Sequence, residues 1–136
     1  MSTTDLELGK ALARRALECM ETGDLSEIDA VLADDYIQHN HLGPGREPVK
    51  AMIRNLRQGI PNLQMRVESL VAEGDMVAAR FVIAGRHEGV LNGVSPTGQP
   101  LEIRGMDMWR VEDGRLKEHW DAVDRLGFMR QLGLVK

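Results

Sequence analysis

One stretch near the C-terminal end constrains the fold more than any other part of the sequence. The segments Arg104 to Val111 and Arg115 to Val123 alternate in side-chain character and flank the break Glu112-Asp113-Gly114. Alternation on both sides of a short glycine-containing break is typical of a β-hairpin. The sequence therefore predicts one antiparallel hairpin between Gly105 and Asp124.

The length of the hairpin loop decides which side chains face each other. A three-residue loop places Asp107 opposite His119 and Gly105 opposite Asp121. A two-residue loop shifts the register by one and places Met106 opposite Asp121. We prefer the three-residue loop, because it gathers the polar side chains into one patch.

The two faces of this hairpin differ in chemistry, because side chains alternate across a strand. The face with carboxylates and an imidazole collects Asp107, Trp109, Lys117, His119 and Asp121. The mostly apolar face collects Met106, Met108, Leu116, Glu118 and Trp120. We expect the first face to line a pocket. The second needs a cover, which favours a homodimer.

The rest of the chain divides into helices followed by strands. Capping patterns at Thr4 and Asp24, and Pro48 at a first helical position, predict three helices before Pro61. Asp124 is a suitable N-cap for a short final helix. The extended segments are predicted at Tyr36 to His41, Leu63 to Val71, Met76 to Arg86 and Leu101 to Val111. This order predicts an α+β fold in which about four long antiparallel strands form a strongly bent sheet against the helices.

The size and charge of the chain limit its partners. Its 136 residues and 43% hydrophobic content suit one domain, residues 1–136, with a sizeable core. The formal charge of −4, with no basic run, argues against nucleic acid and against an anionic membrane. We expect the partner to be a small hydrophobic molecule or a second copy of the chain.

Cysteine usage and hydropathy indicate the compartment. Cys19 is the single cysteine, which excludes an internal disulfide and a cysteine zinc cluster, and its helical apolar pattern predicts a buried thiol. The N-terminus lacks the pattern of an export signal, and no apolar stretch approaches membrane-spanning length. We therefore expect a cytoplasmic protein.

Several motifs together resemble one known family. The chain resembles the SnoaL-like polyketide cyclases, a family of the NTF2-like cone folds, in its order of helices before a curved sheet. It also shares their motifs YIQHN, GRHEG, PTGQP and MWRVEDGRLKEHWD, the last of which precedes FMRQLG. The resemblance covers nearly the whole chain. It implies a cone-shaped barrel and an intramolecular aldol condensation without metal or cofactor. It also implies an acid/base aspartate at the position of Asp121, whereas Asp107 stands where the family's cyclases carry a histidine.

Asp121 is accordingly the candidate catalytic residue. A carboxyl group in a closed, partly apolar pocket exchanges protons near neutral pH. The alternative is a structural carboxylate that pairs with Arg104 or Lys117. Expected substrate contacts, from strands that meet inside the cone, are His39, His87, Asp107, His119, Trp109 and Tyr36. Three histidines with a carboxylate would also suit a metal, but we expect none, because no pair has helical metal-ligand spacing.

Two carboxyl groups on one face suggest coupled protonation. Like charges resist double ionisation, so we expect either Asp107 or Asp121 to stay protonated near neutrality. We assign the proton to Asp121, because Gly105 opposite it supplies no cation while Asp107 faces His119. Exposure of Asp107 at the surface is an equally open alternative.

Two functions fit these residues. The first is an acid/base enzyme, a cyclase or a related isomerase or lyase, that acts on a small hydrophobic carbonyl compound. The second is a non-catalytic module that binds a hydrophobic ligand or serves for dimerisation.

Overall fold

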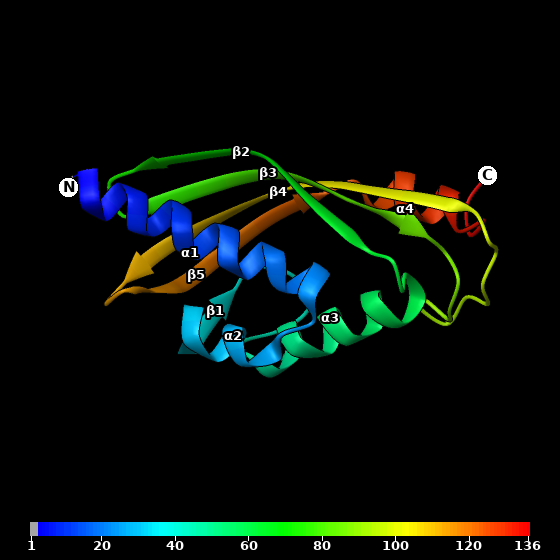
Figure 1. Cartoon of the computed structure of the whole chain (residues 1–136), viewed down its shortest axis with the longest axis horizontal. Helices are drawn as coiled ribbons and strands as arrows, with labels where there is room; N and C mark the ends of the chain where they lie inside the picture. The colour runs from blue at the N-terminus through cyan, green and yellow to red at the C-terminus, as the bar shows by residue number, and fades with distance from the viewer. Residues whose placement is uncertain (1–2) are drawn as a thin grey trace.

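Within residues 3–136, which the structure describes, four helices and five strands form an α+β fold (Figure 1). The structure is a computed structural model. In chain order the elements are α1 (Thr3–Thr22), α2 (Leu25–Val31), β1 (Leu32–Gln38), α3 (Glu47–Gly59), β2 (Gln64–Glu73), β3 (Met76–Arg86), β4 (Pro100–Glu112), β5 (Arg115–Val123) and α4 (Arg125–Gln131). The predicted order of three helices, four long strands and a closing helix is confirmed.

The sheet contains a fifth strand, β1, beside the four strands of the predicted meander. Its order is β1-β5-β4-β3-β2, in which β2 to β5 form the predicted antiparallel meander. β1 joins the edge parallel to β5, so the sheet is mixed. The sequence predicted an extended segment at Tyr36 to His41, but the strand begins earlier, at Leu32. Asp34 and Asp35 hid this start, because aspartate is depleted in strands. Both lie exposed at the edge of the sheet.

Helix starts follow the capping signals in two of three cases. The side chain of Asp24 accepts hydrogen bonds from the N–H groups of Ser26 and Glu27 at the start of α2. Asp124 caps α4 in the same way by accepting from the N–H of Gly127. The prediction for Thr4 is wrong, because α1 already includes it.

The helices α1, α2 and α3 lie on one face of the sheet, and α1 crosses it diagonally (Figure 1). Apolar side chains of α1 pack against β2 and β3, and the buried set includes Leu12, Ala13, Ala16 and Leu17. Cys19 is buried and free, as predicted, and burial raises the pKa of its thiol to about 11. No helix in the described part of the chain is long and apolar enough to cross a membrane.

The hairpin closes with a two-residue loop, so the preferred three-residue loop is wrong. Asp113 and Gly114 both have positive φ, 52° and 75°, as a type I′ turn requires. A bulge then leaves Lys117 of β5 unpaired between two ladder segments, which shifts the register by a further residue. As a result Asp107 faces Asp121, Trp109 faces His119 and Gly105 faces Val123.

The bulge also changes which side chains of β5 point inward. Before the bulge Leu116 faces the core and is fully buried, although the simple alternation placed it on the outer face. After it, His119 and Asp121 face inward, as the alternation predicted. Lys117, expected beside them, forms an ion pair with Asp35 of β1 instead. One extra residue therefore reverses the alternation within a single strand.

Candidate active site

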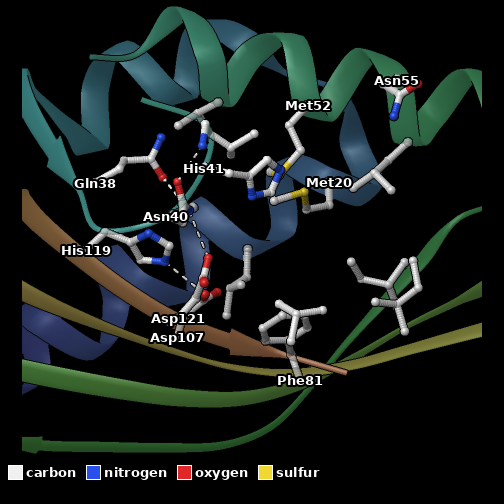
Figure 2. A pocket seen from close by; sticks show the side chains of 18 of the residues that line it. Met20, Gln38, Asn40, His41, Met52, Asn55, Phe81, Asp107, His119 and Asp121 are labelled. Atoms are coloured by element: carbon white, nitrogen blue, oxygen red, sulfur yellow. Dashed lines mark hydrogen bonds and ion pairs between the residues drawn. The ribbon is translucent and has the colours of Figure 1, made fainter. Parts of the chain in front are cut away.

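A cavity of about 370 Å³ lies between the helices and the inner face of the sheet (Figure 2). This volume is within the usual range for sites that bind small molecules. Most of the wall is apolar, and it includes Leu17, Met20, Met52, Leu56, Phe81, Ile103, Phe128 and Met129. The cavity therefore suits a small and largely apolar organic molecule.

Two carboxyl groups and an imidazole converge on this cavity. Asp107 of β4 and Asp121 of β5 are directly paired across the two strands. His119 lies two residues before Asp121, and its Nε2 is 2.9 Å from Oδ1 of Asp107. One possible ligand atom from each of the three residues lies within 4.8 Å of the others. Figure 2 shows the three side chains together on one side of the cavity.

Asp107 is the more deeply enclosed carboxyl group of the pair, with only 9% of the residue exposed. Burial raises the pKa of Asp107, and the adjacent charge of Asp121 acts in the same direction. The hydrogen bond with His119 lowers this pKa, but burial is the larger effect. Our reasons for placing the proton on Asp121 therefore fail. His119 does not keep Asp107 easily ionised, and Gly105 does not face Asp121.

Asn40 holds Asp121 in place, and sequence reasoning missed it. Its amide Nδ2 donates to Oδ2 of Asp121 at 2.9 Å and to Oε1 of Gln38 at 3.1 Å. Its Oδ1 accepts from the N–H of Leu42 at 3.0 Å, so the amide orientation is fixed. The signal was the alternation of Tyr36, Gln38 and Asn40 within the extended segment predicted at Tyr36 to His41. The pairing of Gln38 with His119 shows that this side of the segment faces inward.

Two aromatic residues enclose the imidazole. Trp109 Nε1–H donates to the hydroxyl of Tyr36 at 2.9 Å, and both residues are buried. The ring of His119 lies 5.2 Å from that of Trp109 and 6.1 Å from that of Tyr36, centroid to centroid. Burial raises the pKa of the Tyr36 hydroxyl, which stays protonated. Both aromatic residues line the cavity, where we expected substrate contacts.

His39 does not lie in the cavity, contrary to expectation. Its side chain is 44% exposed, stacks on Trp120 at 5.0 Å and contacts Oε2 of Glu118 through Nε2 at 2.6 Å. The reason is the parallel pairing of β1 with β5, which matches Gln38 with His119. Gln38 then faces inward with His119, and the next residue, His39, faces outward.

His87 is fully buried, but it is not among the residues that line the cavity. Its Nδ1 accepts from the backbone N–H of Thr97 at 3.3 Å and lies 3.0 Å from the Thr97 hydroxyl. Backbone hydrogen bonds join His87 to Gln99 and Gly98 as well. The GRHEG and PTGQP motifs thus meet here, and His87 anchors the loop after β3 instead of contacting substrate.

Gly105 does not open space for a substrate, as we had expected. It pairs with Phe81 of β3 on one side and with Val123 on the other. A Cβ atom at Gly105 would lie 2.7 Å from Cζ of Phe81, so the phenyl ring already fills this position. Phe81 therefore forms the cavity wall here.

Asp107, His119 and Asp121 also form the one cluster in residues 3–136 whose ligand atoms are close enough to hold a metal ion. Carboxylate and imidazole ligands suit zinc, manganese or iron. The three-histidine set considered from the sequence does not form, because His39 and His87 lie elsewhere. Any metal would compete with the His119–Asp107 and Asn40–Asp121 hydrogen bonds.

A curved sheet and N-terminal helices around a cavity lined by carboxyl groups define an NTF2-like α+β protein. A model of the SnoaL-like polyketide cyclase family matches residues 10–132. The chain therefore belongs to the SnoaL-like polyketide cyclase family, as the motifs indicated.

Relatives of known activity and solved structures agree with this assignment. The chain is 30% identical over 129 residues to an aklanonic acid methyl ester cyclase of Streptomyces sp. (strain C5), covering 90% of this chain and 80% of the relative. It is 29% identical over 125 residues to the nogalonic acid methyl ester cyclase of Streptomyces nogalater, covering 86% and 91%. The structure of TsrD from Streptomyces laurentii superposes with a TM-score of 0.86 at 29% identity, over 99% of each chain.

Proposed function

We propose that this protein is a cofactor-independent acid/base enzyme that closes a ring in a small hydrophobic carbonyl compound by intramolecular aldol condensation. The observation that carries the proposal is the pairing of Asp107 and Asp121, with His119 bonded to Asp107, in an apolar cavity. The cyclase relatives support the same chemistry. An isomerase or a lyase would use the same proton transfers.

The two carboxyl groups take different roles in the proposed reaction. Asp121, oriented by Asn40, removes a proton from the carbon beside a carbonyl group, and the C–H electron pair becomes the enol double bond. Asp107, whose raised pKa favours its protonated form, gives a proton to the carbonyl oxygen. The neutral enol therefore forms instead of the free enolate, which is higher in energy.

Ring closure returns both protons. The enol carbon attacks a second carbonyl carbon of the same molecule, so that a C–C bond forms and the second C=O bond becomes a C–O bond. That oxygen receives the proton held by Asp121, and Asp107 recovers its proton as the enol becomes a carbonyl again. His119 packs beside Trp109 and Tyr36 and keeps Asp107 in position.

Substitution of Asp121 by asparagine tests this proposal. With aklanonic acid and its methyl ester each tested as substrate, we expect turnover of the converted compound to fall about 10²- to 10⁴-fold while its affinity stays within about threefold. Asp75→Asn, an exposed turn position, is the matched control and should keep full turnover. Unchanged turnover in Asp121→Asn would contradict the acid/base role.

The alternative is a non-catalytic binding module, and the same experiment separates it from an enzyme. In that case neither the unmodified chain nor any variant turns over polyketide acids or esters, while binding in the cavity persists. The network that fixes Asp107, Asp121 and His119 favours the enzyme, because a purely apolar ligand does not require two carboxyl groups against its surface.

We also propose that the protein is a homodimer joined through the outer face of the sheet. Val71, Met108 and Trp120 lie in one cross-strand row there, and Met106 is near them. Met106 is 53% exposed and Val71 is 62% exposed. An apolar patch of this kind on a sheet is a common dimer surface, because a second copy removes it from water.

A further inference from the structure

Arg125 and His41 form a polar pair at the mouth of the cavity that the proposed proton transfers do not use. Arg125 is the first residue of α4, and His41 follows β1 in the loop that also carries Asn40. Both side chains line the cavity and both are exposed. Nη2 of Arg125 lies 2.6 Å from Nδ1 of His41. Figure 2 shows the ring of His41 reaching over the cavity towards Met20 and Met52.

The positive charge of Arg125 is available to a ligand. Arg125 is the one lysine or arginine among the described residues that lines the cavity. Within those same residues its side chain bonds to His41 and forms no ion pair with a carboxylate. A guanidinium group keeps its proton throughout the physiological range and offers only donors. Part of its donor set therefore faces the cavity mouth without an anion.

His41 adds a second donor at the same place. Because the guanidinium donates, Nδ1 of His41 is the acceptor, and the neutral ring carries its proton on Nε2. The pair thus presents N–H groups from two side chains on two separate segments. A planar carboxylate, with two oxygens that each accept hydrogen bonds, matches such a set of donors.

Charges of both signs line the same cavity on different elements. Asp107 and Asp121 lie on β4 and β5, whereas the exposed Arg125 begins α4 and bonds to His41 in the loop after β1. Arg125 follows Asp121 by four residues, so their Cα atoms are at most about 14 Å apart. An anionic group on a ligand is repelled by the carboxyl groups and attracted by the guanidinium, which fixes the direction in which the ligand enters.

We propose that Arg125 and His41 bind a carboxylate of the substrate, so that the enzyme takes a free carboxylic acid whose reacting carbonyl lies beside Asp121. This inference rests on the proposed function, because it orients the substrate in the same cavity. The relatives are named for methyl esters, in which the carboxyl group is capped and uncharged. Arg125 is then the residue that sets the preference for acid over ester.

Equilibrium binding of a matched acid and ester tests the proposal without any turnover. The probes are 2-naphthoic acid and methyl 2-naphthoate at pH 7, followed by calorimetry and by quenching of tryptophan fluorescence, since Trp109 lines the cavity. We expect the acid to bind about tenfold more tightly than the ester to the unmodified protein. In Arg125→Gln the two affinities should become equal, through a loss of acid affinity alone.

Two further variants sharpen the result. Arg130→Gln removes the same charge from the same helix at a position outside the cavity lining, and it should keep the tenfold preference. His41→Ala should reduce the preference by about threefold, because the Nε2–H donor is lost while the guanidinium remains. Thermal unfolding of each variant confirms that the fold is intact.

The proposal is overturned if the unmodified protein binds the acid and the ester equally well, or binds neither of them. A tenfold preference that persists in Arg125→Gln also overturns it. Either failure leaves the role of Asp121 intact, since that role is measured by turnover in Asp121→Asn. Conversely, a failure of the acid/base role does not change the acid preference measured at equilibrium.

Discussion

Asp107 and Asp121 face each other directly across β4 and β5, on the side of the sheet that borders the cavity. Cross-strand neighbours of like charge are normally unfavourable, and burial makes them more so. The protein tolerates the pair because His119 bonds to Asp107 and Asn40 bonds to Asp121. A pairing that costs stability in this way is typical of a site retained for its chemistry.

Replacement of Asp107 by asparagine should change the pH dependence of stability. The folded-state pKa of Asp107 is raised by burial, so the folded protein binds its proton more tightly than the unfolded chain does. Its contribution to stability is therefore complete below about pH 3.9, the usual carboxyl pKa, and is lost as pH rises through the folded value. Asp107→Asn should not show this loss.

Urea unfolding between pH 3 and pH 8 measures the effect. The free energy of unfolding of Asp107→Asn minus that of the unmodified protein should increase with pH across this window. Asp75→Asn, at an exposed turn, is the control for the loss of one carboxylate. Parallel curves for Asp107→Asn and the unmodified protein would contradict the raised pKa.

Replacement of Asn40 by alanine should impair turnover more than binding. The variant loses the hydrogen bond that orients Asp121, and misplacement of a catalytic group by about 1 Å can reduce the rate about 10²-fold. We expect kcat to fall about 10- to 100-fold and KM to change little. Steady-state kinetics checks this, with Asn55→Ala as the control, because Asn55 also lines the cavity but bonds to Asn92. Equal effects of the two substitutions would argue against a positioning role.

A charge on the outer face of the sheet should separate the proposed dimer. Met108 is 39% exposed in the apolar row next to Trp120, and Met108→Glu would place a charge inside the interface. Sedimentation velocity at micromolar concentration should show a dimer for the unmodified protein and a monomer for this variant. Leu134→Glu, exposed near the C-terminus, should remain dimeric. A monomeric unmodified protein would exclude the interface.

Alanine at Gly105 should destabilise the sheet through Phe81. The new Cβ atom would lie 2.7 Å from the phenyl Cζ, so the ring must move, at a cost of about 1–3 kcal/mol. Urea unfolding of Gly105→Ala, Phe81→Leu and the double variant forms a cycle. The double variant should be more stable than the sum of the single effects predicts, because leucine leaves room for the methyl group. Simple additivity would show that the two residues do not interact.

The sequence by itself determined the order of elements, the hairpin and the family. These features depend on local rules. Alternation predicts strands, Asp24 and Asp124 satisfy the free N–H groups at helix starts, and Asp113-Gly114 adopts the positive φ angles of a tight turn. The inward direction of Asp107 and Asp121 also followed from alternation, since both lie on the same side of the bulge.

Only the tertiary structure decided which residues meet in the site. The two-residue loop moved Asp121 from opposite Gly105 to opposite Met106, and the bulge at Lys117 moved it on to Asp107. No local propensity marks Lys117 as unpaired. The parallel pairing of β1 with β5 turned His39 to the outer face and brought Asn40 to Asp121. The register between strands depends on how all side chains of the inner face pack together. Those contacts join residues far apart in the sequence, so the local sequence does not specify them.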